Sequence, residues 1–421
     1  MNILWQTEHY PDAVKGGGSV VNTYHIVKNM RTLGCKPVVL ARGTDGNGVV
    51  REETNGIAII RCPQPKLPPR LWPLWPRLEP FYVQQILGDI AGPFDAFVCH
   101  DPSYGLALKR LYSARPVLCR VGGSVRTHDS VVLPESLSSL IAQWGYKRAL
   151  LEKFLAKQND TMDARVWDRC DALVVQSAFM KREIANQYGV VSEKIKVIPS
   201  GVDHARYSSP ESSSAIAAQL GGLNQENHVI TFCGRLVRMK NVSYLLRGFA
   251  QMSLRDQCIL VVAGEGEERA KLEAEAAELN ISRRVRFLGH LEKVDELLGV
   301  SDIFVLPSVY EPFANALLEA MAAGIPCLAL RSDFHRVKTS SDEVIVDGET
   351  GFLVDAADPK SLANRLDCLV AQPIFRKEMG MQAQRRCRRL YNWEVCAEQY
   401  LSVIAEISAS LDSRQLRRSL K

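Results

Sequence analysis

Two glutamates in one short segment are the residues whose chemistry is easiest to specify. Glu311 and Glu319 begin and end the run Glu-Pro-Phe-Ala-Asn-Ala-Leu-Leu-Glu, which follows the apolar stretch Ile303–Leu306. We expect Ile303–Leu306 to be a buried strand, with Glu311 in the loop at its end. Carboxylates accept hydrogen bonds from hydroxyls, so Glu319 suits a ribose diol and Glu311 suits the hydroxyls of a sugar. The spacing alone arises by chance, and the strand end, proline, aromatic residue and apolar helix around it make it specific.

A helix is predicted to begin between the two glutamates. Asn315 is a favoured N-cap residue, and a helix that starts there has free N–H groups around Ala316 and Leu317 for a diphosphate. Glu319 follows Asn315 by four residues and therefore lies on the same helical face. One segment is thus expected to bind sugar, phosphates and ribose in order.

Two cations follow another apolar run. Val229–Cys233 leads into Gly234 and Arg235, and Lys240 comes five residues later. At the C-terminal edge of a parallel sheet, where open α/β sheets bind ligands, such cations would contact phosphate oxygens and stabilise a leaving diphosphate. A solvated basic loop is the alternative interpretation, and the neighbouring glutamate run favours the phosphate site.

A glycine-rich segment, Lys15–Gly18, separates the strand predicted at Ile3–Gln6 from the helix predicted at Val20–Leu33. Glycine lets the backbone approach a ligand, and the following helix start offers N–H groups to an anion. The spacing is neither the dinucleotide fingerprint nor an ATP-type phosphate loop. A tight turn explains the glycines equally well.

The rest of the chain alternates short apolar runs with helix-period segments, the pattern of parallel sheets covered on both faces. The strands predicted in the first half are Ile3–Gln6, Pro37–Ala41, Ile57–Arg61, Ala96–Cys99, Val117–Arg120, Ala172–Val175 and Lys196–Ile198. Those predicted in the second half are Val229–Cys233, Ile259–Ala263, Val285–Leu288, Ile303–Leu306 and Cys327–Leu330. The helices predicted between them include Val20–Leu33, Tyr104–Tyr112, Ser243–Met252, Glu267–Leu279 and Ala316–Ala323.

Two successive α/β sets predict two domains. Proline and glycine in Pro199–Asp203 mark the boundary, so the first domain is expected to span 1–199 and the second 200–391. A C-terminal helix over 392–421 is expected to return to the first domain and to end in a frayed basic tail. Pro65–Pro80, with six prolines, is predicted to be a rigid surface loop, with an acceptor-binding or membrane-touching edge as the alternative.

Composition narrows the classes of function. The 421 residues are 46% hydrophobic and 24% charged, with a net charge of +5, which is typical of a globular enzyme and too weakly basic for a nucleic-acid partner. Eleven dispersed cysteines without a C-x-x-C pair predict core residues in a reducing cytoplasm and no zinc site. No signal peptide or long apolar run is present, and peripheral contact with the inner face of a membrane stays open.

Together these segments resemble the retaining glycosyltransferases of family 4, whose GT-B fold has two Rossmann-like domains facing each other across a cleft. The resemblance covers nearly the whole chain, and the order and spacing of its motifs are specific. The motifs are the Gly17-Gly18 loop, Val197–Asp203, Gly234-Arg235 with Lys240, Ala263–Gly266, Phe287–His290, the Glu311 to Glu319 run with Ala320–Ala322, Asp347-Gly348 and Thr350–Phe352.

The resemblance implies a role for each matched residue. The implied catalytic residues are Glu311, Arg235 and Lys240. Arg235 and Lys240 would hold the donor diphosphate, Glu311 the sugar, and Glu319 the ribose. The donor-binding residues it implies are Gly17, Gly18, Gly234, Arg235, Lys240, Gly289, His290, Leu291, Glu311, Phe313, Ala314, Asn315, Ala316, Leu317 and Glu319.

The family moves a sugar from a nucleotide-sugar to an acceptor with retention of the anomeric configuration, and it uses neither metal nor cofactor. The sequence also lacks an Asp-x-Asp metal motif. We therefore expect a hexosyltransferase of polysaccharide biosynthesis that uses a UDP-sugar rather than a GDP-sugar. The acceptor is expected to be a saccharide, a lipid-linked molecule or a small molecule.

Two segments depart from the family pattern. Many relatives place a sugar-contacting histidine where this chain has Gly122, so the candidates for contact with the acceptor or sugar are His100, Gly122, Arg126 and His128. Arg331–Ser341 replaces a short glycine-rich turn, and its residues His335, Arg336 and Lys338 are expected to be solvated surface.

Two other classes of function stay open. Some nucleotide-sugar epimerases share the two-domain shape, although the glutamate run and the cationic pair argue against an isomerase. A non-catalytic nucleotide-sugar-binding protein is suggested by Gly122. A nicotinamide dehydrogenase is poorly supported, because the glycine spacing is wrong and no acidic residue suitably follows the second strand.

Overall fold

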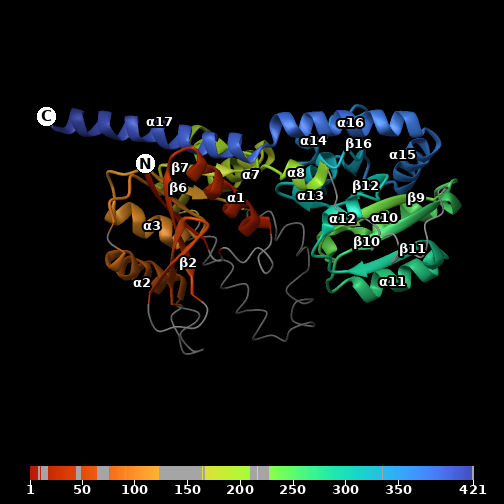
Figure 1. Ribbon diagram of the computed structural model, residues 1–421, viewed down its shortest axis with the longest axis horizontal. Helices are drawn as coiled ribbons and strands as arrows, with labels where there is room; N and C mark the ends of the chain where they lie inside the picture. The colour runs from red at the N-terminus through yellow and green to blue at the C-terminus, as the bar shows by residue number, and fades with distance from the viewer. Residues whose placement is uncertain are drawn as a thin grey trace. The chain divides into compact units, whose positions relative to one another are not determined.

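The chain forms two compact units in a computed structural model (Figure 1). Unit 1 comprises Met1–Pro199 and Trp393–Lys421, and unit 2 comprises Ser200–Asn392. The residues that the structure describes are 1–7, 10, 18–43, 49–63, 75–90, 92–122, 164, 166–208, 216, 227–333 and 335–419.

Unit 1 is built on an eight-stranded sheet in the order β3-β4-β2-β1-β5-β6-β7-β8. Its paired strands are parallel, except that β3 and β4 are antiparallel. The strands are β1 (Asn2–Gln6), β2 (Lys36–Arg42), β3 (Val50–Thr54), β4 (Ile57–Cys62), β5 (Ala96–Cys99), β6 (Val117–Arg120), β7 (Ala172–Val175) and β8 (Ile195–Val197). Strand order reverses between β1 and β5, which makes their C-terminal ends the topological switch point of this unit.

The C-terminal helix belongs to unit 1 and packs beside its first helix (Figure 1). The described helices of unit 1 are α1 (Gly18–Thr32), α2 (Trp75–Asp89), α3 (Pro102–Leu111), α7 (Ala178–Tyr188), the 3-10 turn η2 (Ser192–Lys194) and α17 (Trp393–Ser419). Buried side chains of α17, among them Tyr400, join Trp5 and Val98 in one core. The rings of His25 and Trp393 stack with their centroids 5.0 Å apart. The predicted return of the last helix to the first unit is therefore confirmed.

Three features of unit 1 differ from the sequence-based expectation. Helix α17 continues to Ser419, so the basic tail is helical over most of its length rather than frayed. The last part of Pro65–Pro80 is not a loop, because α2 begins at Trp75. Pro76 is tolerated there, since a backbone N–H at the second helical position has no partner within the helix. Strand β3 lacks an apolar pattern because it is exposed, and only its pairing with β4 defines it.

Unit 2 contains a six-stranded parallel sheet in the order β11-β10-β9-β12-β14-β16 and a two-stranded sheet of β13 and β15. The strands are β9 (His228–Cys233), β10 (Cys258–Ala263), β11 (Val285–Gly289), β12 (Ile303–Leu306), β13 (Tyr310–Glu311), β14 (Cys327–Leu330), β15 (Lys338–Thr339) and β16 (Gly351–Val354). Every residue of β10, β12, β14 and β16 is buried. This burial is the reason that these strands read as continuous apolar runs in the sequence.

Helices cover the sheet of unit 2 (Figure 1). The described helices are α8 (His204–Ser208), α10 (Val242–Ala250), α11 (Arg269–Glu278), α12 (Val294–Leu298), α13 (Asn315–Ala322), α14 (Ser341–Val344), α15 (Pro359–Ala371) and α16 (Pro373–Leu390), with the 3-10 turns η3 (Arg238–Lys240), η4 (Arg255–Gln257) and η5 (Ser282–Arg284). Because the strands of the main sheet are parallel, the loops that follow β9, β11 and β12 meet at one edge. These loops carry the residues predicted to contact the donor.

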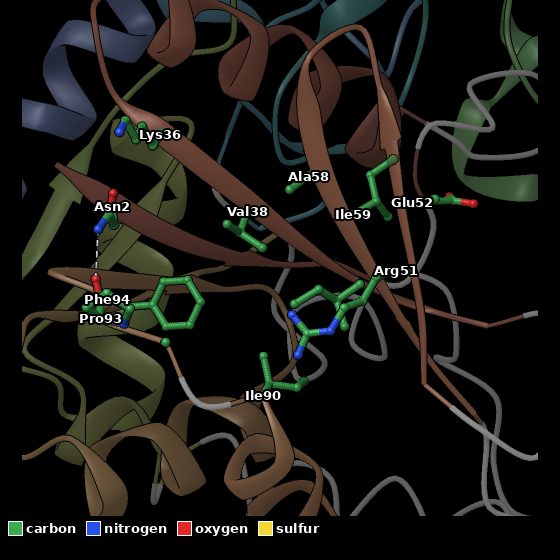
Figure 2. Close-up of a pocket in the computed structure, with 12 residues that line it drawn as sticks. Asn2, Lys36, Val38, Arg51, Glu52, Ala58, Ile59, Ile90, Pro93 and Phe94 are labelled. Atoms are coloured by element: carbon green, nitrogen blue, oxygen red, sulfur yellow. Dashed lines mark hydrogen bonds between the residues drawn. The ribbon is translucent and has the colours of Figure 1, made fainter.

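A cavity of about 360 Å³ lies in unit 1 beside the starts of β1 and β2 (Figure 2). Its lining residues are Asn2, Lys36, Val38, Arg51, Glu52, Ala58, Ile59, Ile60, Ile90, Gly92, Pro93 and Phe94. Ligands of open α/β sheets bind at the opposite edge, outside the C-terminal ends of the strands. The cavity is therefore not part of the predicted donor site.

Among the described residues, none of the helices combines the length and the apolar character that crossing a membrane requires.

Candidate functional site

The loops after β9, β10 and β11 contact one another directly. The Gly234 N–H donates to the Ala263 carbonyl at 3.0 Å, and the Gly264 N–H donates to the Gly289 carbonyl at 2.7 Å. Gly264 has a φ of +143°, and a Cβ there would lie 1.8 Å from the Gly234 carbonyl oxygen. Only glycine fits such a close approach, so these glycines pack the three strand ends into one surface.

Lys240 and Glu311 form an ion pair at the edge of that surface. Both side chains are mostly buried, with 17% and 13% of their areas exposed. The Ser308 hydroxyl donates to the same Glu311 oxygen, Oε2, at 3.2 Å. The two charged residues that the sequence assigned to diphosphate and sugar therefore lie in contact.

Backbone hydrogen bonds fix the positions of that pair. The Val309 N–H donates to the Met239 carbonyl at 2.9 Å, which joins the loop of Lys240 to the loop of Glu311. The Ser340 N–H donates to the Glu311 carbonyl at 3.0 Å, and β13 pairs with β15 on the same side. The loop after β12 is thus supported from two directions.

Arg235 is exposed, and in the part of the chain that the structure describes no carboxylate pairs with its guanidinium. It follows Gly234 at the end of β9, at the same sheet edge as Lys240. A solvent-facing guanidinium at this place can take a phosphate without breaking an existing ion pair.

Helix α13 begins at Asn315, as predicted, but Asn315 is not its N-cap. The cap position is Ala314, and no side chain caps the helix. The sequence predicted that the Leu317 N–H is a free donor. In the structure it donates to the Ala314 carbonyl at 3.0 Å. The Asn315 Oδ1 atom is buried and has no hydrogen-bond partner. The Asn315 N–H donates to the Phe313 carbonyl at 3.1 Å and the Leu318 N–H to the Ala314 carbonyl at 3.4 Å, so backbone carbonyls take donors that a side-chain cap would otherwise bind.

Glu319 lies on α13 among side chains from three other elements. Burial raises the pKa of Glu319 to about 7, and the nearby Asp295 contributes to that rise. Arg206 and a hydrogen bond from Tyr207 act in the opposite direction. Cys233, the last residue of β9, is close enough for the Glu319 charge to raise the pKa of its thiol. Glu319 therefore lies near the C-terminal end of β9, where the predicted diphosphate site begins.

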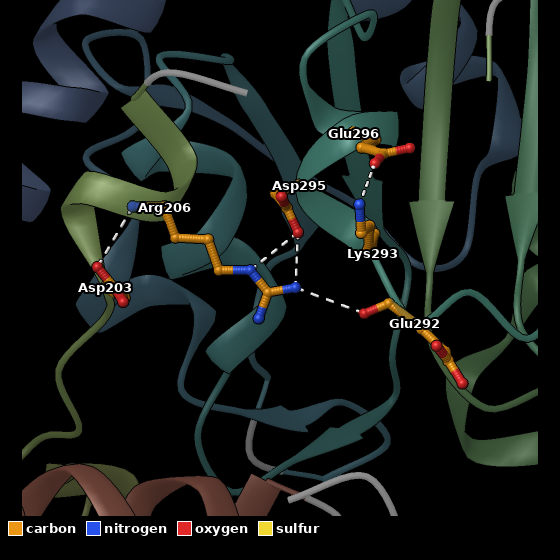
Figure 3. Close-up of polar contacts among 6 residues, drawn as sticks. All are labelled: Asp203, Arg206, Glu292, Lys293, Asp295 and Glu296. Atoms are coloured by element: carbon orange, nitrogen blue, oxygen red, sulfur yellow. Dashed lines mark hydrogen bonds and ion pairs between the residues drawn. The ribbon is translucent and has the colours of Figure 1, made fainter. Parts of the chain in front are cut away.

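Arg206 and Tyr207 were missed by sequence reasoning. They lie on α8, a helix of five residues whose length is too short for a recognisable periodic pattern. Arg206 donates to the Asp295 carboxylate through Nε at 2.8 Å and Nη2 at 2.6 Å (Figure 3). Its Nη2 also lies 3.4 Å from the Glu292 carbonyl (Figure 3). Arg206 thus joins α8 to the loop after β11, which holds the predicted base contacts Gly289, His290 and Leu291.

The candidates in unit 1 have a different environment. The His100 Nε2 lies 3.3 Å from Trp5 Nε1, 3.4 Å from the Thr23 hydroxyl and 3.5 Å from Arg120 Nη1. Burial and the Arg120 charge hold the pKa of His100 well below its usual range. His100 is therefore a neutral hydrogen-bond acceptor at the switch point, where Gln6 accepts from its backbone N–H at 3.0 Å.

The other candidates of unit 1 divide into two groups. Gly122 is exposed just beyond β6, and Gly18 is the first residue of α1. Gly17, Arg126 and His128 lie outside the described residues.

In the segment Arg331–Ser341, His335 and Arg336 are exposed, as expected, and Lys338 is partly buried. The Asp333 carboxylate accepts the backbone N–H groups of His335, Arg336 and Val337, each at 2.8 Å. These hydrogen bonds lower the pKa of Asp333. The turn leads into β15, which pairs with β13 beside Glu311. The segment therefore supports the loop that carries Glu311.

Two parallel α/β units with a returning C-terminal helix, and cations beside carboxylates at the strand ends of the second unit, define a protein of the GT-B class. Sucrose-phosphate synthase from Thermosynechococcus elongatus superposes with a TM-score of 0.74 at 21% identity, over 97% of this chain and 99% of that one. HepE from Anabaena, solved in complex with UDP-glucose, superposes with a TM-score of 0.69 at 21% identity, over 97% and 100% of the two chains.

Family models identify the family itself. The models described as Glycosyltransferase Family 4 and Glycosyl transferases group 1 match residues 16–206 and 216–386. The chain belongs to the family 4 glycosyltransferases. A D-inositol 3-phosphate glycosyltransferase of Corynebacterium jeikeium is 33% identical over 250 residues, which are 56% of this chain and 57% of that protein. The chain spans about three fifths of the length of such curated relatives.

Proposed function

We propose that this protein is a glycosyltransferase that moves a hexose from a nucleotide-sugar to an acceptor, with retention at the anomeric carbon and without a metal ion. The observation that supports the proposal is the ion pair of Lys240 and Glu311, which follow the neighbouring strands β9 and β12, with Glu319 near Cys233 at the end of β9. Arg235 follows one of those strands and adds an exposed cation.

The chemistry of the site supports a nucleoside diphosphate donor. The leaving diphosphate gains negative charge as the bond to the sugar breaks, and fixed cations favour that state over the bound substrate. Lys240 is paired with Glu311 in the unliganded protein. On donor binding, Lys240 exchanges this partner for a phosphate oxygen, and Glu311 becomes an acceptor for the sugar hydroxyls.

Retention is proposed to follow because the acceptor attacks the anomeric carbon on the same face from which the leaving group departs. The acceptor oxygen forms the new bond to the anomeric carbon, and the bond to the diphosphate oxygen breaks. A diphosphate oxygen then takes the acceptor's proton, so no protein base is required. This agrees with the environment of His100 at the switch point of unit 1. Its Nε2 atom already lies within hydrogen-bond distance of Trp5, Thr23 and Arg120.

The relatives guide the choice of substrates. HepE was solved with UDP-glucose, and we propose a UDP-sugar as the donor here. One relative is named an inositol 3-phosphate glycosyltransferase and another an α-maltose-1-phosphate synthase. Phosphorylated small molecules therefore join saccharides and lipid-linked acceptors as candidates. A cytoplasmic site of action is proposed from the eleven cysteines, all of which are free thiols.

Transfer with a defined product tests the proposal. The protein is incubated with UDP-glucose, and with the GDP- and ADP-sugars, against a panel of sugar phosphates, oligosaccharides and polyprenyl-linked acceptors. The expected product carries the new linkage in the anomeric configuration of the donor, read by proton NMR. An inverted product contradicts the mechanism. Conversion of the donor alone to an epimer identifies an isomerase, and donor binding without any turnover identifies a binding protein.

A further inference from the structure

Helix α8 connects the two sides of the proposed nucleotide site. On one side, Arg206 binds the Asp295 carboxylate and the Glu292 carbonyl, next to the loop proposed to contact the base (Figure 3). On the other side, α8 packs against α13, which carries Glu319, the proposed ribose acceptor. The Arg206 guanidinium carbon lies 5.5 Å from the centre of the Tyr207 ring. Arg206 and Tyr207 thus lie on a helix that contacts both α12, which carries Asp295, and α13, which carries Glu319.

The anchoring of α8 makes that contact rigid. Asp203 accepts the Arg206 backbone N–H at 3.3 Å at the start of the helix (Figure 3). The His204 Nε2 lies 3.0 Å from the Tyr391 carbonyl, and the Val202 N–H donates to the same carbonyl at 3.2 Å. A helix of five residues is unstable alone, so these contacts hold it against the main body of unit 2.

The charges around Glu319 have opposing effects. Asp295 on α12 is a second carboxylate near Glu319, and two like charges disfavour the ionised form of each. Arg206 interacts with both carboxylates, since it pairs with Asp295 and also attracts the Glu319 charge. Cys233 on β9 contributes a neutral thiol, because burial and the Glu319 charge raise its pKa. Arg206 and Tyr207 are thus the groups that offset both burial and Asp295.

We propose that Arg206 and Tyr207 are positioning residues: their helix α8, fixed to Asp295 and packed against α13, orients the Glu319 carboxylate so that it can accept both hydroxyls of a nucleotide ribose. This inference rests on the proposed function, because it concerns the same donor site. A protonated carboxyl has one oxygen occupied by its proton and cannot accept two hydroxyl donors equally. Donor affinity at neutral pH therefore depends on α8, although neither of its residues needs to touch the donor.

The test measures Glu319 directly and needs no ligand. The infrared difference between wild type and Glu319→Gln isolates the protonated carboxyl of Glu319, and its intensity is followed from pH 5 to pH 9. Because burial raises the pKa of Glu319 to about 7, wild type is expected to titrate near neutrality. In Arg206→Met the midpoint is expected to move upward by about one pH unit, the size of shift that a lost neighbouring opposite charge produces. Tyr207→Phe moves it in the same direction.

Two control variants separate charge from structure. Adding Asp295→Asn to Arg206→Met removes the opposing carboxylate and is expected to return the midpoint toward the wild-type value. Lys293→Met removes a neighbouring cation that pairs with Glu296 at 2.9 Å (Figure 3), and it is expected to leave the midpoint unchanged. A midpoint that stays at the wild-type value in both Arg206→Met and Tyr207→Phe overturns the proposal.

UDP binding supplies the second measurement, by calorimetry over the same pH range. The ratio of variant to wild-type affinity is read, because the phosphates of UDP also titrate. Arg206→Met is expected to bind UDP about fivefold more weakly at pH 7 and to recover at pH 9, because a midpoint one pH unit higher leaves roughly a fifth as much ionised Glu319 at pH 7. Arg206→Lys restores most of the affinity. An equal loss at every pH indicates a structural role only and contradicts the inference. If wild type binds no UDP, the proposed donor fails, while the infrared titration still decides the role of α8.

Discussion

At the scale of single residues, the site combines carboxylates and cations whose unliganded partners are each other. Lys240 pairs with Glu311, and Arg206 pairs with Asp295. Pairing neutralises the mostly buried charges of Lys240 and Glu311 until a ligand arrives, because an unpaired buried charge is costly. When the donor binds, Lys240 therefore exchanges one charged partner for another, and little further desolvation of its ammonium group is needed.

Glu319 is expected to limit the stability of unliganded unit 2. Burial raises the pKa of Glu319 to about 7, above the ordinary value of a glutamate. The folded state therefore holds a proton that the unfolded chain releases, and stability falls as pH rises from the ordinary value to about 7. Glu319→Gln removes this effect. It is expected to melt roughly 3–6 °C above wild type at pH 8, with a smaller gain at pH 5.

The same variant is expected to lose affinity for UDP, since the amide offers only one acceptor oxygen. Melting curves at the two pH values, with and without UDP, measure both effects. Equal gains in melting temperature at pH 5 and pH 8 would contradict the shifted pKa.

Lys240 is expected to act mainly on the rate of transfer. Its charge is worth most when the diphosphate leaves, so Lys240→Met should lower kcat by about 10²–10³-fold and change KM for the donor little. The variant leaves Glu311 mostly buried and unpaired, which also destabilises the fold. In the double variant Lys240→Met/Glu311→Gln, stability is expected to recover while transfer stays lost. Recovery of transfer in the double variant would exclude the assigned roles.

At the scale of elements, backbone contacts join the strand ends of unit 2 to one another. The loops after β9, β10 and β11 exchange hydrogen bonds at Gly234, Gly264 and Gly289. The loop after β12 is tied to the loop after β9 through Val309 and Met239. The site residues therefore depend on the close approach of these loops.

Gly264→Ala tests that dependence. The new methyl group would lie 1.8 Å from the Gly234 carbonyl oxygen, so the loop after β9 must move. We expect a loss of more than about 3 kcal/mol in the free energy of unfolding, with weaker UDP binding. Gly348→Ala is the matched control, because Gly348 has a φ of +81° but a Cβ added there would have no neighbouring atom within 4 Å. Its cost is expected to be about 1 kcal/mol. Urea denaturation measures both variants, and equal losses would argue against the close loop contact.

At the scale of the whole molecule, the strands predicted with the right bounds are ones whose burial requires an apolar sequence. Strands such as Ala96–Cys99, Ile303–Leu306 and Cys327–Leu330 appear with their predicted bounds, because a strand covered on both faces must be apolar throughout. Strands β3, β13 and β15 carry no such pattern, since they are exposed or only two residues long. These three strands were missed for that reason, whereas β16 was missed although all of its residues are buried.

The candidate site was predictable only in part. Glu311 and Lys240 follow strand ends, and parallel topology brings those ends together, so their contact could be expected. Arg206 and Tyr207 could not, because their proximity to Glu319 depends on how a five-residue helix packs in three dimensions. Asn315 was assigned to the cap on residue type alone, and the first turn satisfies its N–H groups without that side chain.

The proposed function depends above all on Arg235 and Lys240 binding the phosphates of a nucleotide donor. Calorimetric titration of wild type, Arg235→Met and Lys240→Met with UDP and with uridine measures this binding. Each variant is predicted to bind UDP at least about tenfold more weakly, the worth of one charge-assisted contact, and to bind uridine with unchanged affinity. Wild-type affinity for UDP in both variants would contradict the proposed phosphate site.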